Sequence, residues 1–445
     1  MKLTIRSGLA GLFLLSACQT YSPAPPRLDA YPATLAARAL TPPASGQWTA
    51  ADLLAVALAN NPQIAEAVAR ARTAQAGVGV ARVPQAATLT LTAEYSDEAS
   101  HWLYGVGSDI PLDIGARKSG RIGQAELAAL QARYDHAEVV WTVRAALARA
   151  VADRQAADAE IAIAGRAADL RRQRAERLDR RVAAGEDPRG LALTAHADLV
   201  TAERRLSDAR GRRSQSDAAL ARALGVSTPA VATLNLAPSP ALADPDWRSL
   251  REQAPLTRKD VLRAVVDYDL AESALRTEVG RQYPEIHIGP GYTYDHGVQK
   301  IPFNLTLVLP PLDLNRAAIA QAQAKRLEAG RSLEAVQAAV LAATDQAAAS
   351  LATARDAEGL ARDRDLPTAR RAAQGTAAMV RAGEGDRVDD LAAQAAVLDA
   401  ELALLDARRA HRSAILDLED ALRTPFDPAE HALLQDNFKR LGAAR

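Results

Sequence analysis

A short motif occurs twice in the sequence, and its spacing constrains the fold more than any other feature. Pro111-Leu112-Asp113 and Pro311-Leu312-Asp313 lie 200 residues apart. In both copies a run of alternating polar and apolar residues precedes the motif, and a long alanine-rich run follows it. Proline cannot donate to a sheet ladder, and the aspartate stands where a helix N-cap needs an acceptor. We therefore expect strand-to-helix junctions at Pro111, Asp113, Pro311 and Asp313, in a chain built as a tandem repeat.

Both alternating runs have the two-residue period of strands with one apolar face. In the first run, Leu89 and Leu91 alternate with threonines, and a polar turn follows before the apolar pattern resumes. The second run repeats the pattern around His296-Gly297. The sequence therefore predicts β-hairpins at 86–110 and 285–310.

Each hairpin is flanked by helical sequence. The predicted helices after the hairpins are 113–184 and 187–224 in the first repeat, and 313–382 and 386–422 in the second. A helix of about 70 residues is about 105 Å long. A further helix precedes each hairpin, and Pro62 is expected to break the first of these. Pro367 is expected to kink the long helix of the second repeat. Because the two shorter helices of the first repeat together have about the length of the long one, we expect them to stack end to end beside it.

The N-terminus predicts export and lipidation. Lys2 and Arg6 precede an apolar stretch, 9–15, that is too short to span a bilayer. The sequence Leu15-Ser16-Ala17-Cys18 resembles the lipobox of bacterial lipoproteins, and Cys18 is the only cysteine. We expect a lipoprotein signal peptide followed by acylated Cys18; the alternative is a plain signal peptide. One acyl signal anchors weakly, so a larger contact with membrane lipid is expected.

These boundaries predict six parts. They are a signal peptide (1–17), a proline-rich extended tether (18–47), a first repeat (48–225), a connector (226–246), a second repeat (247–424) and a polar C-terminal tail (425–445).

Composition and motifs argue against several classes of function. The formal net charge is zero, which does not favour nucleic acid as a partner. The seven histidines are scattered without ligand-like spacing. No phosphate-binding loop or nucleophile motif is found. We therefore expect no catalytic residues, no metal site, no cofactor and no enzyme activity.

The lipobox, the paired junctions, the two Gly-Glu turns and the leucine-rich helices behind them occur in an order that resembles the TolC family of outer-membrane efflux proteins. The resemblance covers the mature sequence. It implies a mainly α fold with a transmembrane β part: a homotrimer with a twelve-stranded β-barrel and a long periplasmic α-helical barrel. It also implies a passive exit duct in the outer membrane, docked to a periplasmic membrane-fusion adaptor and an inner-membrane pump of the RND type.

The resemblance also implies two functional regions. Residues at the two predicted helical tips would engage the adaptor; they are Val182, Gly185, Glu186, Arg381, Gly383 and Glu384. The alternative is that these turns only end helices. Asp389 falls where TolC carries an inward-facing aspartate in its constriction, and Asp390 adjoins it. Three symmetry-related carboxylates would form a gate that attracts cations. A solvated helix face is the alternative, and Ala392 replaces the second TolC aspartate.

Two other functions fit parts of the sequence. The chain could be the duct of a type I protein secretion system. It could instead be a structural periplasmic coiled-coil lipoprotein, although that does not explain strands with single apolar faces. The cargo stays open among drugs, metal ions and polypeptide, and the compact chain with short turns favours heavy-metal efflux.

Overall fold

The structure, a computed structural model, describes residues 21–97, 99–238 and 246–443. The chain divides into two compact units, 1–39 and 40–445. The described part of the first unit contains helix α1 (Ala30–Ala37). The prediction of an extended tether is therefore wrong at these residues. Pro32 lies in the first turn of α1, where a helix needs no proline N–H, and the alanines around it favour a helix.

The second unit begins before the predicted end of the tether. Leu40 packs against a buried core that includes Trp48, Leu53 and Leu224. Trp48 also forms a β-bridge with Leu236, from the predicted connector. Both segments therefore belong to the packed unit, because their apolar residues have a core to contact.

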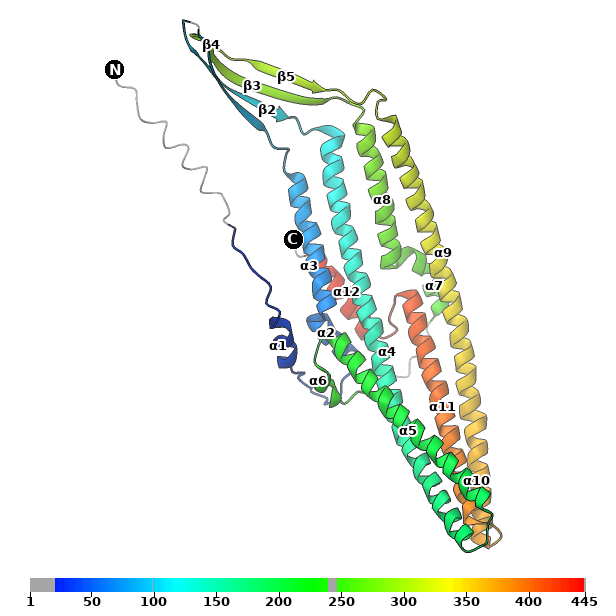
Figure 1. Cartoon of the computed structure of the whole chain (residues 1–445). Helices are drawn as coiled ribbons and strands as arrows, with labels where there is room; N and C mark the ends of the chain where they lie inside the picture. Colours follow the sequence, from blue (N-terminus) through cyan, green and yellow to red (C-terminus); the bar gives the residue numbers. More distant parts are fainter. Residues whose placement is uncertain (1–20, 98, 239–245, 444–445) are drawn as a thin grey trace. The chain divides into compact units, whose positions relative to one another are not determined.

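The first repeat contains two short helices, a hairpin, two long helices and one further short helix. In order they are α2 (Ala50–Asn60), α3 (Pro62–Arg82), β1 (Thr88–Tyr95), β2 (Trp102–Pro111), α4 (Gly115–Ala183), α5 (Arg189–Leu224) and α6 (Thr228–Ala232). The strands lie at one end of the helices, and the α4–α5 turn lies at the other (Figure 1).

Asn61 joins two stacked helices of the first repeat. Its side chain caps α3 by accepting from the Gln63 N–H at 2.9 Å, with Pro62 as the first helical residue. Its Nδ2 donates to the Ala223 carbonyl at 2.9 Å, at the end of α5. One buried side chain therefore satisfies the ends of two helices, and α5 follows on from the α2–α3 break beside α4.

The second repeat has the same order. Its elements are α7 (Trp247–Thr257), α8 (Lys259–Gly280), β3 (Glu285–Asp295), β4 (Val298–Lys300), β5 (Phe303–Val308), α9 (Arg316–Leu360), a π-helical turn η1 (Ala361–Asp365), α10 (Leu366–Ala382), α11 (Arg387–Leu422) and α12 (Pro428–Ala443). Arg258 stands between α7 and α8, and its guanidinium bonds the Ala421 carbonyl near the end of α11. This contact is the counterpart of Asn61 and Ala223.

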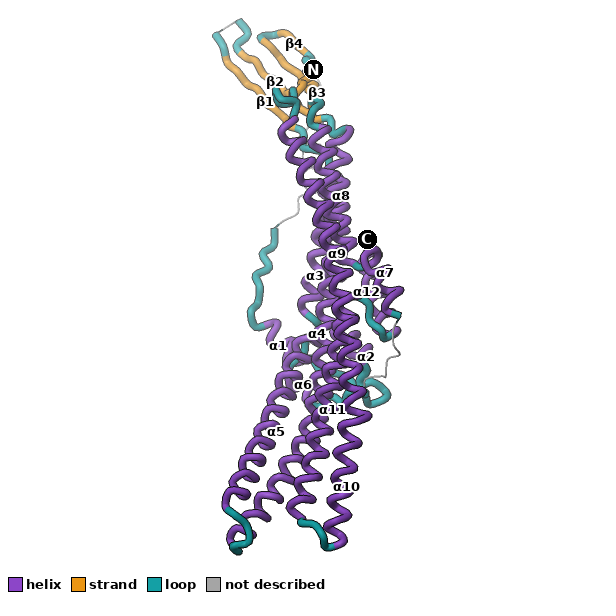
Figure 2. Tube along the Cα trace, turned by 90° about the vertical axis from the view of Figure 1, so that its right-hand side faces the viewer, coloured by secondary structure: helices purple, strands orange, loops and turns teal. Residues whose placement is uncertain are grey.

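The second long rod is interrupted where the sequence predicts a kink. The π-helical turn η1 immediately precedes Pro367, which lies in the first turn of α10. Proline has no N–H to bond the carbonyl four residues earlier, so the ladder widens locally. The rod nevertheless continues along the same side of the bundle (Figure 2).

One antiparallel sheet joins the two repeats. Strand β2 pairs with β1 on one side and with β3 on the other, and β3 also pairs with β4 and β5. The second hairpin's return strand is split at Ile301-Pro302, because Pro302 cannot donate to the ladder. The sheet therefore has four ladder positions, and β1 and the β4–β5 strand form its edges.

Helix α12 spans most of the predicted C-terminal tail, and part of it is buried. Its residue Glu430 is buried, and a carboxylate oxygen lies 2.5 Å from Nη2 of Arg144 on α4. Arg144 also bonds Glu419 of α11 at 2.6 Å. A buried arginine with two carboxylates is stable only if the geometry keeps all three paired. The C-terminal helix is therefore docked on α4, and it also packs against α2.

Candidate functional site

The sheet has one apolar and one polar face. Residues opposite each other in the register share a face. The apolar face carries Leu89, Leu91, Tyr95, Trp102, Tyr104, Val106, Ile110, Ile288, Tyr292, Tyr294, Phe303, Leu305 and Leu307. Most of its side chains are exposed in this subunit: Leu91 is 76% exposed and Leu305 is 60% exposed. An uncovered apolar face of this size is suited to lipid or to another protein surface.

The opposite face is polar. It carries Thr88, Thr90, Thr92, Glu94, Asp109, His287, Thr293, Asn304 and Thr306. His287 Nδ1 lies 3.0 Å from Asp109, across the β2–β3 pair that joins the repeats. A wall with lipid-suited residues on one side and hydrated residues on the other can separate a membrane from an aqueous lumen.

The two junctions differ. Asp113 was predicted to cap α4, but Ile114 is the N-cap and no side chain caps it. The Asp113 carboxylate instead pairs with Arg121, whose Nη1 lies 3.1 Å from it. The Arg121 guanidinium lowers the pKa of the Asp113 carboxyl below its usual value. Because Arg121 also bonds the Ala81 carbonyl at 2.9 Å, this ion pair fastens α3 to α4.

Asp313 comes closer to the predicted role of a helix cap. Its carboxylate accepts from the backbone N–H of Asn315 at 3.0 Å and of Ala317 at 3.3 Å. The N-cap position itself is Asn315, in a left-handed conformation. Pro111 ends β2 and pairs with His287, whereas Pro311 lies in the loop before α9.

Both helical tips have the same backbone geometry. At the first tip, Gly185 has φ +77° and donates to the Val182 carbonyl at 3.0 Å, while Glu186 donates to the Arg181 carbonyl at 2.9 Å. This pair of bonds is a Schellman motif. At the second tip, Gly383 (φ +78°) and Glu384 make the same two bonds to Val380 and Met379. The positive φ explains why glycine stands at both positions.

The predicted tip residues are not equally accessible. Glu186, Arg381 and Glu384 are exposed and available to a partner. Val182 is half-buried and packs against a small cluster that includes Leu178 and Val388. It therefore holds the two tips together in the structure.

A link between the tips is a feature that the sequence did not reveal. Arg181 Nε lies 2.7 Å from Asp187 of its own tip, and its Nη1 pairs with Asp386 of the other tip. Asp386 in turn caps α11 by accepting from the Val388 N–H at 2.9 Å. The two residues are 205 positions apart. Only the matching positions of Arg181 and Asp386 beside the two Gly-Glu turns could have indicated this pair.

The structure separates the two predicted gate residues. Asp389 is exposed in the first turn of α11 and makes no hydrogen bond or ion pair with the described residues. Asp390 is 2% exposed and is bound by Arg387 and by Gln394 Nε2, the latter at 2.9 Å. Asp390 therefore does not reach solvent in this subunit, and the gate prediction rests on Asp389.

Three further points concern the described residues. None of their helices is long and apolar enough to cross a membrane. Their histidines and carboxylates nowhere form a group of three that could hold a metal ion. Cys18, the predicted lipidation site, lies outside the described part of the chain.

A family model described as outer membrane efflux protein matches residues 53–226 and 250–422. The chain belongs to this family. It is thus an efflux channel protein of the outer membrane and not an enzyme, and the two matched segments correspond closely to its two repeats.

One relative and two solved structures show what the chain is similar to. The chain is 26% identical over 377 residues to the cobalt-zinc-cadmium resistance protein CzcC of Cupriavidus metallidurans, covering 82% of this chain and 86% of that protein. A membrane protein of Pseudomonas aeruginosa superposes with a TM-score of 0.72 at 21% identity, covering 86% of this chain and 91% of the other. The outer membrane protein VceC of Vibrio cholerae gives 0.70 at 18% identity, covering 84% and 96%. The fold is TolC-like, mainly helical with a small antiparallel sheet.

Proposed function

We propose that this family member is the outer-membrane duct of a tripartite efflux system and that it works as a homotrimer. The observation that carries the proposal is the sheet with one apolar face, one polar face and two unpaired edges. Open sheet edges are not tolerated in lipid. Three copies with four ladder positions each would close a twelve-stranded barrel, an even number within the usual range. The polar faces would then line the lumen.

The helical tips are the proposed docking point for a periplasmic membrane-fusion adaptor, which would connect the duct to an inner-membrane pump of the RND type. The exposed residues Glu186, Arg381 and Glu384 lie at the end of the helices farthest from the sheet (Figure 1). A passive duct has no energy source of its own, so the energy for transport would come from the pump. Asp389, one per subunit, would form a ring of three carboxylates near this opening.

We propose divalent metal cations as the cargo. The resistance named for the relative CzcC supports this choice. The polar face of the sheet also suits hydrated cations, since it carries hydroxyl and carboxylate side chains such as Thr88, Glu94 and Asp109. A ring of Asp389 side chains would raise the local concentration of cations.

The apolar face provides the test of the duct. Replacing both Leu305 and Leu307 with arginine should prevent assembly in the outer membrane, because an arginine on a lipid-facing strand costs about 2–4 kcal/mol at the bilayer midplane. A strain with this variant should be as sensitive to zinc, cobalt and cadmium as a strain that lacks the gene. Heat-stable oligomer in outer-membrane fractions and metal sensitivity are the two measurements.

Thr306→Arg is the matched control, because Thr306 lies between these leucines on the polar face. It should assemble normally. Normal assembly of the double variant would contradict the duct and favour a structural coiled-coil lipoprotein. Failed assembly of the double variant with unchanged metal resistance would contradict the cargo only.

Cys18 is the proposed lipid anchor, on the periplasmic side of the outer membrane. Cys18→Ala should abolish labelling with radioactive palmitate and leave the protein folded but less firmly held in membranes. The barrel supplies the larger membrane contact, and one acyl signal adds only weak binding. Persistent palmitate labelling of the variant would show that the lipobox assignment is wrong.

A further inference from the structure

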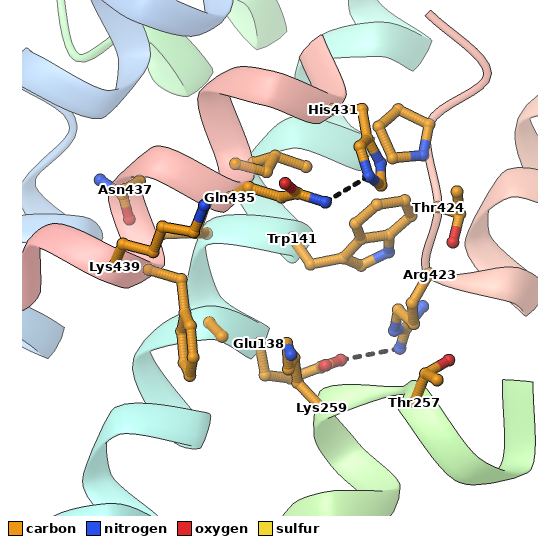
Figure 3. A pocket seen from close by; sticks show the side chains of 15 residues that line it. Glu138, Trp141, Thr257, Lys259, Arg423, Thr424, His431, Gln435, Asn437 and Lys439 are labelled. Atoms are coloured by element: carbon orange, nitrogen blue, oxygen red, sulfur yellow. Dashed lines mark hydrogen bonds and ion pairs between the residues drawn. The ribbon is translucent and has the colours of Figure 1, made fainter. Parts of the chain in front are cut away.

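A pocket of about 460 Å³ lies among the helices, away from both the sheet and the tips. Figure 3 shows it between α4, the beginning of α8, the end of α11 and the docked helix α12. Its apolar wall is formed by Ala137, Val140, Trp141, Pro425, Leu434 and Phe438. The volume is within the range of sites that bind small molecules.

The pocket is held in shape by buried polar contacts. Trp141 is 5% exposed, and its Nε1 donates to Asp420 at 2.7 Å. Helix α12, which supplies one wall, is fixed by the ion pair between Glu430 and Arg144 described above. Trp141, Arg144 and Glu430 are all buried, so these contacts fix the inner wall of the pocket.

The charged lining is predominantly positive. Glu138 is its only carboxylate, and it is already paired with Arg423 at 2.7 Å. Lys259 and Lys439 also line the pocket, and neither forms an ion pair with any residue in the described ranges. The Lys259 ammonium lies 4.8 Å from the centre of the Phe438 ring and is half-buried. A half-buried cation without a counter-ion gains strongly from a charge-assisted hydrogen bond.

We propose that this pocket binds an amphipathic organic anion. The apolar body of the ligand lies against Trp141 and Phe438, and its acidic group pairs with Lys259 at the pocket edge. Lys439, which is exposed, adds positive potential at the same side. The site involves neither the polar face of the sheet nor Asp389, and α12 supplies one of its walls. Free fatty acids and soluble aromatic acids share the required chemistry.

The test uses the full-length protein in lipid nanodiscs, with empty nanodiscs as the blank. Isothermal titration compares dodecanoate, naphthalene-2-sulfonate and the neutral naphthalene-2-sulfonamide. At least one of the two anions should bind saturably, with one site per chain. Stronger binding of dodecanoate identifies a fatty acid as the ligand class, and stronger binding of the sulfonate identifies an aromatic acid. Absence of saturable binding by both anions overturns the proposal.

Variants locate the binding. Lys259→Gln should weaken anion binding by about tenfold, because it removes a hydrogen bond between charged groups, and should leave binding of the neutral sulfonamide unchanged. Ala137→Phe should fill the pocket and abolish binding of the anions and of the neutral sulfonamide. The mass of the assembly and the circular dichroism spectrum show whether this variant is folded. Lys325→Gln, an exposed lysine on α9, is the matched control. Equal affinities for Lys259→Gln and Lys325→Gln overturn the proposed site.

Discussion

Arg181 is the residue that connects the two repeats at their tips. Its guanidinium contacts a carboxylate of each tip, Asp187 and Asp386. A contact that joins the two tips resists any motion that separates them. The planar guanidinium can serve both carboxylates at once, which a lysine could not do equally well.

Arg181→Gln should therefore loosen both tips without unfolding the protein. Ion pairs near the surface contribute little to stability even when they are partly buried, as these are, so amide hydrogen exchange should accelerate by only about two- to fivefold. The change should appear at residues 181–187 and 383–388, which hydrogen-exchange mass spectrometry resolves.

Arg180→Gln is the control for this substitution. Arg180 is exposed and makes no ion pair with the described residues, so its loss should leave exchange at the second tip unchanged. If Arg181→Gln alters only the first tip, the cross-link does not hold the second one.

At the scale of an element, the beginning of α11 depends on a carboxylate. Asp386 accepts from the Val388 N–H, and this backbone hydrogen bond, together with Arg181, lowers the pKa of the Asp386 carboxyl. Helix α5, its counterpart in the first repeat, begins at Pro188 without a side-chain cap. The two equivalent helices therefore differ in their response to acid.

The first turn of α11 should lose protection from hydrogen exchange in acid. A carboxyl whose pKa is lower in the folded state stabilises that state at pH values above its ordinary pKa, about 3.9. This contribution to stability is lost as the pH falls through the pKa of the folded state. The Val388 amide should thus keep a constant protection factor from pH 8 to pH 5 and lose protection below about pH 4.

The Leu191 amide in the first turn of α5 provides the comparison within the same molecule. Its protection should not follow the titration of Asp386. A parallel loss at both amides would indicate acid unfolding of the tips as a whole, and unchanged protection of Val388 at pH 3 would exclude the cap as a stabilising contact.

At the scale of the whole molecule, the duplicated pattern in the sequence was enough to predict the class of fold. Strand periodicity and the two Gly-Glu turns depend on local physical chemistry, and the structure has hairpins and tips at these positions. The break at Pro62 and the disturbed helix before Pro367 were predictable for the same reason, since proline acts on its own backbone.

The features that the sequence did not reveal depend on contacts between distant residues. Asp113 was predicted to cap a helix because aspartate is favoured at helix N-caps. In the structure its carboxylate pairs with Arg121 instead. The docking of α12 was not predictable either, because the burial of Glu430 depends on its pairing with Arg144, which lies far away in the sequence. The Arg181 link between the tips likewise requires knowing that both turns lie side by side.

The central claim is that one chain supplies only a third of a closed tube. The most direct measurement is the mass of the detergent-solubilised protein by native mass spectrometry. The account predicts a complex with the mass of three mature chains, with β-sheet signal in its circular dichroism spectrum. A folded protein with the mass of one chain would contradict it.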